Sequence, residues 1–407
     1  MREMKDSGVR WIGKIPTKWT IAKAKNCVEI QNGSDPKTEG SIPVYGSGSM
    51  SFKTCGEYKE GPSVLIGRKG ATLHIPHYIS SKFWNVDTAF NVYSKSIFDL
   101  KYYFYCAHVF DYTLYMSQTT LPSMTQTAYE NMFLPLPTQE EQYAIANQLD
   151  QICSKIDAVL EKTRASIEEY KKLKQAVITQ AVTKGVRGDR PMKDSGIEWI
   201  GDIPAEWEIR KIFRAINKVG DIDHYMPDSV DDGIPYLMTG DLQEKLSDVN
   251  LKRCKKVSFQ DYEMLSSKIR VSKGDVIFAR YATIGTVCFV DTEDNILVSY
   301  ACLIIKPNSS LLYGEFLFYY LKSTAFLEEI KQYIKANTQA NVGLDSVSKA
   351  KIALPSVLEQ QKIVEYLRDK CKKIDTLIAK KQQYLTEIEN YKKSLIYEYV
   401  TGKKEVV

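Results

Sequence analysis

The chain has 407 residues, of which 44% are hydrophobic and 26% are charged, so it is long enough for two or three domains with sizeable cores. Its formal net charge of +5 is small for this length, which argues against a generally basic surface for binding polyanions. The first residues, MREMKDSGVR, lack the apolar core of a signal peptide and no apolar run is long enough to span a bilayer, so we expect a soluble cytoplasmic protein.

A fifteen-residue segment near the start occurs a second time, 188 residues further on. The copy at Lys5–Trp19 reads KDSGVRWIGKIPTKW, and the copy at Lys193–Trp207 reads KDSGIEWIGDIPAEW. The chain has only five tryptophans, so two at matching positions indicate a tandem duplication. We expect each copy to head one half of the molecule and to form a rigid joint between a long helix and the next domain, with its tryptophans packed inside.

Residues 1–137 are predicted to form the first domain, which includes the first copy of the repeat. Short β-branched or aromatic runs, such as Ile42–Tyr45, Ser63–Ile66 and Phe90–Tyr93, are bounded by Gly, Pro, Ser and Asn, as is typical of strands. The aromatic-rich segment 98–116 has apolar residues at helical spacing. We therefore expect a mixed domain that contains both strands and helices.

Residues 138–190 are predicted to form a long helix and a short linker. No Pro or Gly occurs from Thr138 to Lys184, and Thr138 with Glu141 forms a capping-box pattern. Bulky residues then recur three or four positions apart, with one position skipped near Ser166; they are Leu149, Ile152, Ile156, Val159, Thr163, Tyr170, Leu173 and Val177. A helix of ~45 residues would be ~70 Å long, which favours a coiled coil.

Residues 191–355 are predicted to form a second mixed domain, which includes the second copy of the repeat. Val276–Arg280 in this domain matches the pattern of Val64–Arg68 in the first, with an apolar run that ends in arginine. Most of the remaining sequence of the two domains is dissimilar. The pattern indicates that the domains share an origin and have diverged.

Residues 356–407 are predicted to hold a second long helix, from about Ser356 to Thr401. It aligns with the first helix at an offset of 218 residues, so that Leu149 meets Leu367. The predicted fold class is α+β, with two mixed α/β domains separated by two long antiparallel helices that form a coiled coil. The internal repeat would be quasi two-fold, with the second helix ending near residue 1.

The sequence holds no recognisable catalytic or cofactor-binding motif. It lacks a G-x-x-x-x-G-K-[ST] loop and a dinucleotide-binding G-x-G-x-x-G, and no Ser/His/Asp set can be identified. His74 and His77 have no carboxylate or Cys at a metal-ligand spacing, and none of the eight Cys forms a Cys-x-x-Cys pair. We therefore expect a non-catalytic chain with no metal, no cofactor of its own, and reduced, mostly buried thiols.

Polar, aromatic and basic loops are the remaining candidates for function. Residues 20–137 carry ten Lys and Arg against nine Asp and Glu, and residues 205–355 carry nineteen against twenty, so any nucleic-acid surface must come from charge placement. Arginine, Asn, Gln and hydroxyl side chains on loops suit contact with base edges and phosphates. The candidate DNA contacts are Arg68, Lys69, Ser123, Gln126, Lys252, Arg253, Lys255, Arg280, Tyr281, Lys335, Asn337 and Gln339. A structural alternative is that Arg68 and Arg280 each form a structural ion pair within the chain and that the lysines form a solvated face.

The order of these parts resembles the specificity subunit of type I restriction–modification enzymes. The resemblance rests on the duplicated Trp-Ile-Gly-x-Ile-Pro-x-x-Trp at Trp11–Trp19 and Trp199–Trp207, on the helix openings at Leu136–Gln142 and Leu354–Gln360, and on the two long helices. It implies two target-recognition domains that each read one half of a bipartite duplex-DNA sequence. It also implies that the helices set the spacing of the two halves and dock two methyltransferase (modification) subunits.

The resemblance implies further partners and cofactors outside this chain. The modification subunits would bind S-adenosylmethionine and methylate adenine, and a separate restriction (translocase) subunit would use ATP and Mg, so this chain would supply neither activity. The candidate partner-binding residues on the helices are Glu141, Gln142, Ile156, Glu359, Gln360 and Ile374. Two alternatives stay open: a coiled-coil tether or scaffold whose end domains bind proteins, which the balanced charge would explain, and an enzyme with an unrecognised site, such as a nuclease.

Overall fold

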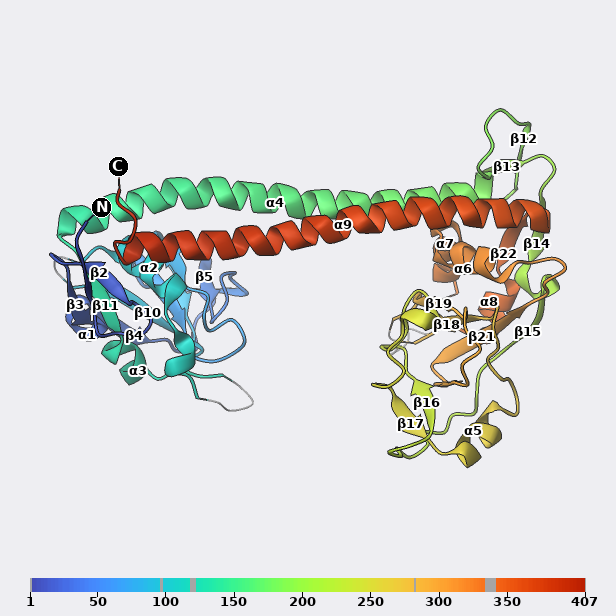
Figure 1. The fold of residues 1–407 in the computed structure, drawn as a ribbon, viewed down its shortest axis with the longest axis horizontal. Coiled ribbons are helices and arrows are strands. Elements are labelled where there is room, and N and C mark those ends of the chain that lie inside the picture. The colour runs from blue at the N-terminus through green and yellow to red at the C-terminus, as the bar shows by residue number, and fades with distance from the viewer. Residues whose placement is uncertain (1, 96–97, 118–121, 282, 334–341, 407) are drawn as a thin grey trace. The chain divides into compact units, whose positions relative to one another are not determined.

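The computed structural model describes residues 2–95, 98–117, 122–281, 283–333 and 342–406. The chain divides into two compact units: unit 1 is Met1–Ala165 with Lys381–Val407, and unit 2 is Ser166–Lys380. Each unit contains one copy of the repeat, one mixed domain and a part of both long helices, as the colours in Figure 1 allow the reader to follow. In the part of the chain that is described, no helix is both long enough and apolar enough to cross a membrane.

The two copies of the repeated segment form the same small antiparallel hairpin. The paired strands are β1 (Met4–Asp6) with β2 (Lys14–Pro16) in unit 1 and β12 (Met192–Asp194) with β13 (Asp202–Pro204) in unit 2. The last tryptophan of each copy is almost fully buried: Trp19 is 2% exposed and Trp207 is 1% exposed. The prediction that these two side chains pack inside is confirmed.

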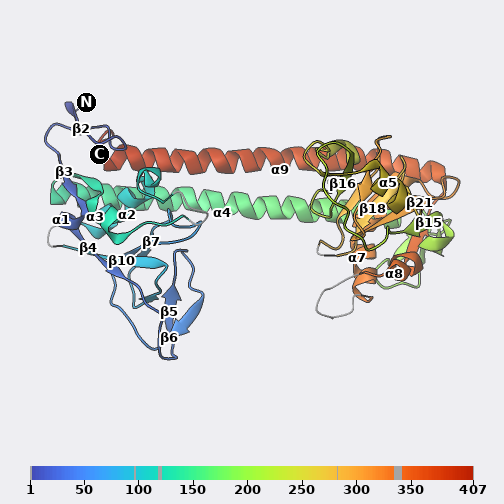
Figure 2. The same cartoon turned by 90° about the horizontal axis from the view of Figure 1, so that it is seen from below.

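Unit 1 is built on a four-stranded antiparallel sheet with the order β4–β10–β7–β8, of which Figure 2 labels β4, β10 and β7. The strands are β4 (Val28–Asn32), β10 (Ala89–Ser94), β7 (Ser63–Gly67) and β8 (His77–Ile79). A three-stranded sheet, β6–β5–β9, and a two-stranded sheet, β11–β3, complete the domain; their strands are β6 (Lys53–Cys55), β5 (Ile42–Tyr45), β9 (Trp84–Asn85), β11 (Phe133–Leu136) and β3 (Thr20–Lys23). All five residues of β7 are buried, as expected for a central strand with covered faces.

The core of unit 1 joins this sheet to the long helices. One face of the sheet packs on α2 (Leu100–Val109), through Val64, Phe90 and Tyr103, and the same cluster includes Leu149 from the first long helix and Leu395 from the second. Two other helices in this domain are α1 (Ala24–Cys27) and α3 (Gln126–Asn131). The mixed domain is therefore fixed to the helix pair by one continuous hydrophobic core.

Unit 2 repeats the strand order of unit 1 element by element. Its sheets are β15–β21–β18–β19, β17–β16–β20 and β14–β22. The strands are β14 (Glu208–Lys211), β15 (Ile216–Gly220), β16 (Ile234–Leu237), β17 (Lys255–Val257), β18 (Val276–Ala279), β19 (Val287–Phe289), β20 (Leu297–Val298), β21 (Cys302–Pro307) and β22 (Lys351–Leu354). The helices are α5 (Phe259–Ser266), α6 (Gly314–Lys322), α7 (Thr324–Lys331) and α8 (Leu344–Lys349). The two domains thus share one topology despite their dissimilar sequences.

The two long helices begin and end almost where the sequence predicts. They are α4 (Gln139–Lys184) and α9 (Val357–Val400). At the start of α4, the Glu141 amide donates to Thr138 Oγ1 at 3.3 Å, and the Thr138 amide donates back to Glu141 Oε2 at 3.2 Å. The predicted capping box is therefore confirmed. The end of α4 is fixed by Gly185, whose φ of +74° is the left-handed conformation of a helix C-terminus.

The buried seam of α4 differs in phase from the predicted one. Val159 and Leu173, predicted to face inward, are 41% and 48% exposed, whereas Leu160 and Ile167 are buried. With Ile167 included, no position is skipped, and the inward positions are spaced three or four apart at 149, 153, 156, 160, 163 and 167. The prediction was wrong at Val159 because Val159 and Leu160 are adjacent apolar residues that leave the phase of the pattern open, and packing decides it.

Matching ion pairs join α4 to α9 in both units. In unit 1, Lys392 donates to Asp157 at 2.6 Å, and in unit 2, Lys174 donates to Asp375 at 2.8 Å. Both residues of one pair are 218 positions from their equivalents in the other, which is the offset predicted from the sequence. Each unit therefore joins the helices in the same register.

Candidate nucleic-acid interface

Each long helix begins with a glutamate that holds the tryptophan of the repeat. Trp19 Nε1 donates to Glu141 Oε2 at 3.0 Å, and Trp207 Nε1 donates to Glu359 Oε2 at 3.1 Å. The repeat, the helix N-terminus and the domain are thus joined at one point in each unit. Glu141 and Glu359, predicted to bind a partner, have this role inside the chain.

The glutamine after each of these glutamates ties the long helix to the domain. The Gln142 side-chain oxygen accepts from the Asp99 amide at 2.8 Å, and the Gln360 oxygen accepts from the Tyr313 amide at 2.7 Å. Asp99 and Tyr313 are the N-cap residues of α2 and α6, so each glutamine binds the start of the equivalent domain helix. Both glutamines also donate to a proline carbonyl just before the helix.

These contacts correct the predicted partner-binding set. Gln142 is 2% exposed and Gln360 is fully buried, so neither side chain can meet a second protein in this fold. Ile374 is buried and Ile156 is half-buried against the core of unit 1, because both lie in the inward seam. Sequence position alone could not show that the residues that open each helix face its own domain.

In unit 1, the loop after β7 brings together three of the predicted DNA contacts. The Met124 amide donates to the Arg68 carbonyl at 2.9 Å, and Lys69 forms an antiparallel bridge with Ser123. The Arg68 guanidinium lies over the Phe90 ring, 5.8 Å from its centroid. Lys69 is 43% exposed, and its ammonium lies 3.6 Å from a carboxylate oxygen of Asp87. The structure therefore gathers basic and hydroxyl side chains at this edge of the sheet.

Gln126, predicted to join this group, is used inside the domain. Its side-chain nitrogen donates to the Ile30 carbonyl at 3.0 Å and to Glu130 at 2.8 Å, and its oxygen accepts from Asn32 at 3.1 Å. These bonds hold the start of α3 against β4. They satisfy the amide oxygen and both amide hydrogens, so the prediction of a base contact is not supported by its geometry.

In unit 2, Arg280 has the backbone position of Arg68 but a different environment. The Val342 amide donates to the Arg280 carbonyl at 3.1 Å, which matches the Met124 bond in unit 1. The Arg280 side chain is 10% exposed, and its guanidinium pairs with Asp221 at 2.6 Å. The structural alternative of an ion-pair partner thus describes Arg280, and its prediction as a DNA contact is corrected. Tyr281, next to it, is half-buried, with its ring 4.9 Å from the guanidinium.

The basic tract before β17 is divided in its environment. Lys252 and Arg253 are exposed on a turn. Lys255 donates to the Pro227 carbonyl and lies over the Tyr236 ring, so its charge is held by the domain. Only the first two therefore extend into solvent. Three further predicted contacts, Lys335, Asn337 and Gln339, lie outside the described residues.

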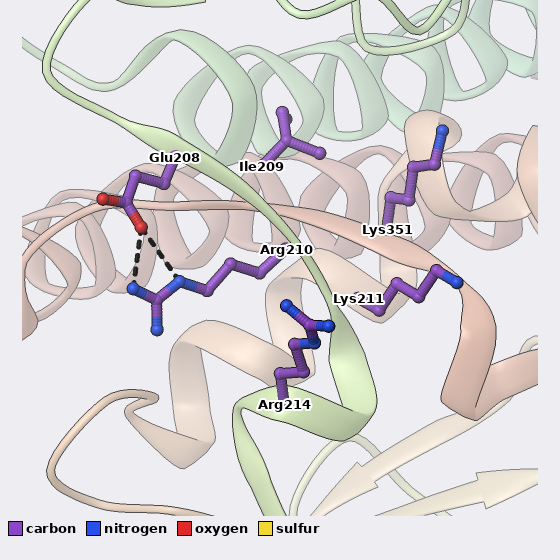
Figure 3. Close-up of a pocket in the computed structure, with 6 residues that line it drawn as sticks. All are labelled: Glu208, Ile209, Arg210, Lys211, Arg214 and Lys351. Carbon is purple, nitrogen blue, oxygen red and sulfur yellow. Dashed lines mark hydrogen bonds and ion pairs between the residues drawn. The ribbon is translucent and has the colours of Figure 1, made fainter.

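Unit 2 also has a basic cleft that the sequence did not single out (Figure 3). The cleft has a volume of about 670 Å³, and its lining residues are Glu208, Ile209, Arg210, Lys211, Arg214 and Lys351. Arg210 donates to Glu208 at 2.7 and 2.9 Å. Figure 3 shows the ammonium ends of Lys211 and Lys351 directed away from that pair. The signal in the sequence was the run EIRKIFR, but Lys351 is distant in sequence, so only the strand pairing shows the cluster.

The described residues contain no cluster of three or more His, Cys, Asp or Glu side chains that could hold a metal ion. Seven of the eight cysteines are buried and all are free thiols. Burial raises the pKa of Cys371 to about 11 and that of Cys302 to about 12, so both thiols stay protonated at neutral pH. The seven buried cysteines therefore have the environment of core residues.

Comparison with known proteins assigns this arrangement to a family. The family model described as "Type I restriction modification DNA specificity domain" matches residues 16–169 and 204–389, one segment for each half of the chain. The "Type I restriction enzyme EcoBI specificity subunit" of Escherichia coli is 21% identical over 430 residues, which cover 99% of this chain and 90% of that protein. The "Type I restriction enzyme MjaVIII specificity subunit" of Methanocaldococcus jannaschii is 28% identical over 299 residues, covering 71% of this chain and 66% of that protein.

A solved structure has the same fold. It is described as "Structural basis underlying complex assembly and conformational transition of the type I R-M system", and its matching chain has a TM-score of 0.68 at 13% identity. The match covers 95% of this chain and 98% of that chain. Because the family model spans both halves, with their duplicated joints and shared topology, the chain belongs to the type I restriction–modification DNA specificity family.

Proposed function

We propose that this chain reads a bipartite DNA sequence, with one half-site for each unit, as the specificity subunit of a type I restriction–modification complex. The observation that carries the proposal is the combination of one repeated framework with two different loop surfaces. The joints, sheets and glutamine contacts are equivalent in both units, whereas the loop after β7 exposes Lys69 and the loop after β18 has Arg280 buried in an ion pair. Identical frames with different side chains suit two readers of different bases.

We infer that α4 and α9 form an antiparallel coiled coil that sets the spacing between the half-sites. The matched pairs Lys392–Asp157 and Lys174–Asp375 support one fixed register along the two helices. The regular spacing of inward residues supports the same inference. A rigid spacer would make the distance between half-sites part of the recognised signal.

The exposed apolar side chains of the helices support docking of two copies of one modification subunit. Val159 and Leu377 are both 41% exposed and are 218 residues apart. Leu173 and Tyr391, 48% and 57% exposed, are related by the same offset. Equivalent exposed positions on two quasi-symmetric helices fit two copies of the same partner. These four residues replace the buried glutamines as the candidate docking positions.

In this proposal, catalysis belongs to the partners in the cytoplasm. The modification subunits would bind S-adenosylmethionine, and a restriction subunit would use ATP and Mg to move along and cleave DNA. This chain would contribute recognition and spacing. The balanced charge of its domains fits a subunit that depends on its partners for part of the contact with the DNA backbone.

Binding by the assembled complex tests the proposal directly. We expect the chain with its modification subunits to prefer a bipartite target duplex, mapped from the methylated adenines of its host, over random duplex DNA. Equal affinity for both duplexes would instead favour a tether whose domains bind proteins. Incubation of the chain alone with DNA and Mg should give no cleavage, whereas cleavage would favour the nuclease alternative.

Exchange of one domain tests whether the units read independently. Residues 20–137 can be replaced by the equivalent domain of another family member while both helices and both joints are kept. We expect one half-site of the methylated sequence to change and the other half-site and the spacer to stay the same. A change in both half-sites would contradict independent readers.

A further inference from the structure

In the basic cleft of unit 2, cationic side chains lie close together although their mutual repulsion destabilises the fold. Lys211 on β14 and Lys351 on β22 are direct partners in the antiparallel register, so the two side chains lie on the same face of the sheet. Like charges directly opposite each other on paired strands are destabilising. Arg214, which is exposed at the end of the adjoining turn Ile212–Arg214, adds a third cation to the cleft.

Nearby negative charge offsets this cluster only in part. Of the described residues that line the cleft, only Glu208 is a carboxylate, and it already pairs with Arg210. Behind the cleft, the buried Glu329 carboxylate accepts from the Lys351 amide and interacts with the Lys351 charge. Among the residues that the structure describes, no carboxylate forms a salt bridge with Lys211, Arg214 or Lys351. The arrangement therefore leaves three cationic groups whose mutual repulsion an anionic ligand would relieve.

Unit 1 lacks this feature at the equivalent strands. The pairing of β3 with β11 places Lys23 opposite Phe133, where unit 2 has Lys211 opposite Lys351. Lys23 lies over the Phe133 ring and donates to Asn131 at 3.2 Å. A partner that meets both units alike would be expected to find the same surface on each. The cleft is therefore suited to a ligand that unit 2 alone contacts.

We propose that the cleft binds the phosphate backbone of duplex DNA without reading bases. The inference rests on the proposed DNA-binding function and adds a site separate from the loops that follow β7 and β18. The three cations can neutralise phosphates, whereas the described residues that line the cleft include no Asn or Gln, the residues that read adenine edges. Duplex DNA is favoured over an acidic protein because its phosphates recur along the backbone and can engage several cations at once.

The test removes the three charges in the complex with modification subunits. The variant Lys211→Gln, Arg214→Gln, Lys351→Gln is compared with the wild type by fluorescence anisotropy, using the mapped target duplex and a random duplex over a range of salt concentrations. Each phosphate neutralised contributes roughly 0.9 to the slope of log K against log salt, so we expect the slope to fall by roughly two to three. Affinity for both duplexes should fall by the same factor, roughly tenfold or more at low salt, with their ratio unchanged.

Two control variants have their substitutions in the same unit. Lys211→Arg, Arg214→Lys, Lys351→Arg keeps the charges and should bind as the wild type does. Lys273→Gln, Lys331→Gln, Lys349→Gln removes three lysines that pair with Glu293, Glu328 and Asp345, and should leave the salt slope nearly unchanged. Thermal unfolding of all three variants checks that the domain is intact.

The outcomes separate this inference from the proposed function. An unchanged slope and affinity in the charge-removal variant, with target preference retained, overturns the cleft as a DNA site and leaves the proposed function intact. Loss of complex assembly with unchanged DNA binding would assign the cleft to an acidic protein partner and also overturns the inference. A fall in affinity for the target alone would show base reading and contradict a backbone site. A wild-type complex without target preference would instead count against the proposed function.

Discussion

In both units an ion pair joins a domain helix to a long helix, but the two charges are reversed between the units. In unit 1, Lys101 on α2 pairs with Asp150 on α4; in unit 2, Glu315 on α6 pairs with Arg368 on α9. Lys101 and Glu315 are each two residues after the N-cap, and Asp150 and Arg368 are 218 positions apart. The ion pair between domain helix and long helix is therefore equivalent in place but reversed in sign.

The comparison shows which contacts the framework requires. The buried Trp–Glu and Gln–amide bonds are identical in both units, because a buried donor or acceptor needs a partner of the right kind. The partly exposed ion pair needs only opposite charges, so its sign can reverse. A domain moved onto the other helix would place Lys101 beside Arg368, or Glu315 beside Asp150. The pair thus favours each domain on its own helix.

The largest expected effect is at the tryptophans of the joint. Trp19→Ala and Trp207→Ala should each destabilise their own unit by about 3–5 kcal/mol, because each removes a fully buried ring and leaves a cavity. Chemical denaturation with hydrogen exchange on each unit measures this. The control Trp19→Phe retains most of the packing and should cost less. Loss of DNA recognition in Trp19→Ala at unchanged stability would argue against a structural role.

The buried glutamines should have the next largest effect, and an equal one in both units. Gln142→Ala leaves the Asp99 amide without this acceptor, and Gln360→Ala does the same at Tyr313. Each unsatisfied buried group costs about 1–3 kcal/mol. The free energy of unfolding should fall by similar amounts in the two variants. A much larger loss in one unit would show that the two contacts are not equivalent.

Breaking the reversed ion pair should destabilise unit 2 more than unit 1. Lys101 and Asp150 are 40% and 35% exposed, so Asp150→Arg should destabilise unit 1 by only about 1 kcal/mol. Glu315 is 1% exposed, so Arg368→Asp leaves a buried carboxylate near a like charge and should cost about 3 kcal/mol in unit 2. The double variant Lys101→Asp, Asp150→Arg restores an ion pair but not the hydrogen bond that Tyr105 donates to Asp150 at 2.7 Å, so it should recover part of the loss in unit 1. No recovery in the double variant would mean that the pair is not the source of the loss.

The last expected effect is a histidine-linked pH dependence of unit 1. Burial, with the nearby Lys392, lowers the pKa of His108 to about 4, whereas the equivalent position in unit 2 is Lys322. An unfolded histidine titrates near 6.5, so between that pH and about 4 the unfolded chain binds a proton that the folded chain does not. The stability of unit 1 should therefore fall as pH drops through this window. His108→Gln should reduce the dependence; an identical pH profile would exclude His108 as its source.

The sequence by itself determined the features that local patterns encode. The duplication, the capping box at Thr138 and the limits of both long helices follow from residue spacing and composition, which act over a few positions. The offset of 218 followed from an ungapped alignment of two such patterns, and the ion pairs of Lys174 and Lys392 agree with it.

Only the tertiary structure decided which side of each pattern faces inward and which charges meet. Leu160 takes the inward position that was predicted for Val159, and Gln142 is buried. Arg280 pairs with a carboxylate that is 59 residues away in sequence. The tertiary structure also showed one topology in two domains of dissimilar sequence, and it brought Lys351 beside Lys211. These outcomes depend on contacts between distant segments, where packing and desolvation select among choices that local spacing leaves equal.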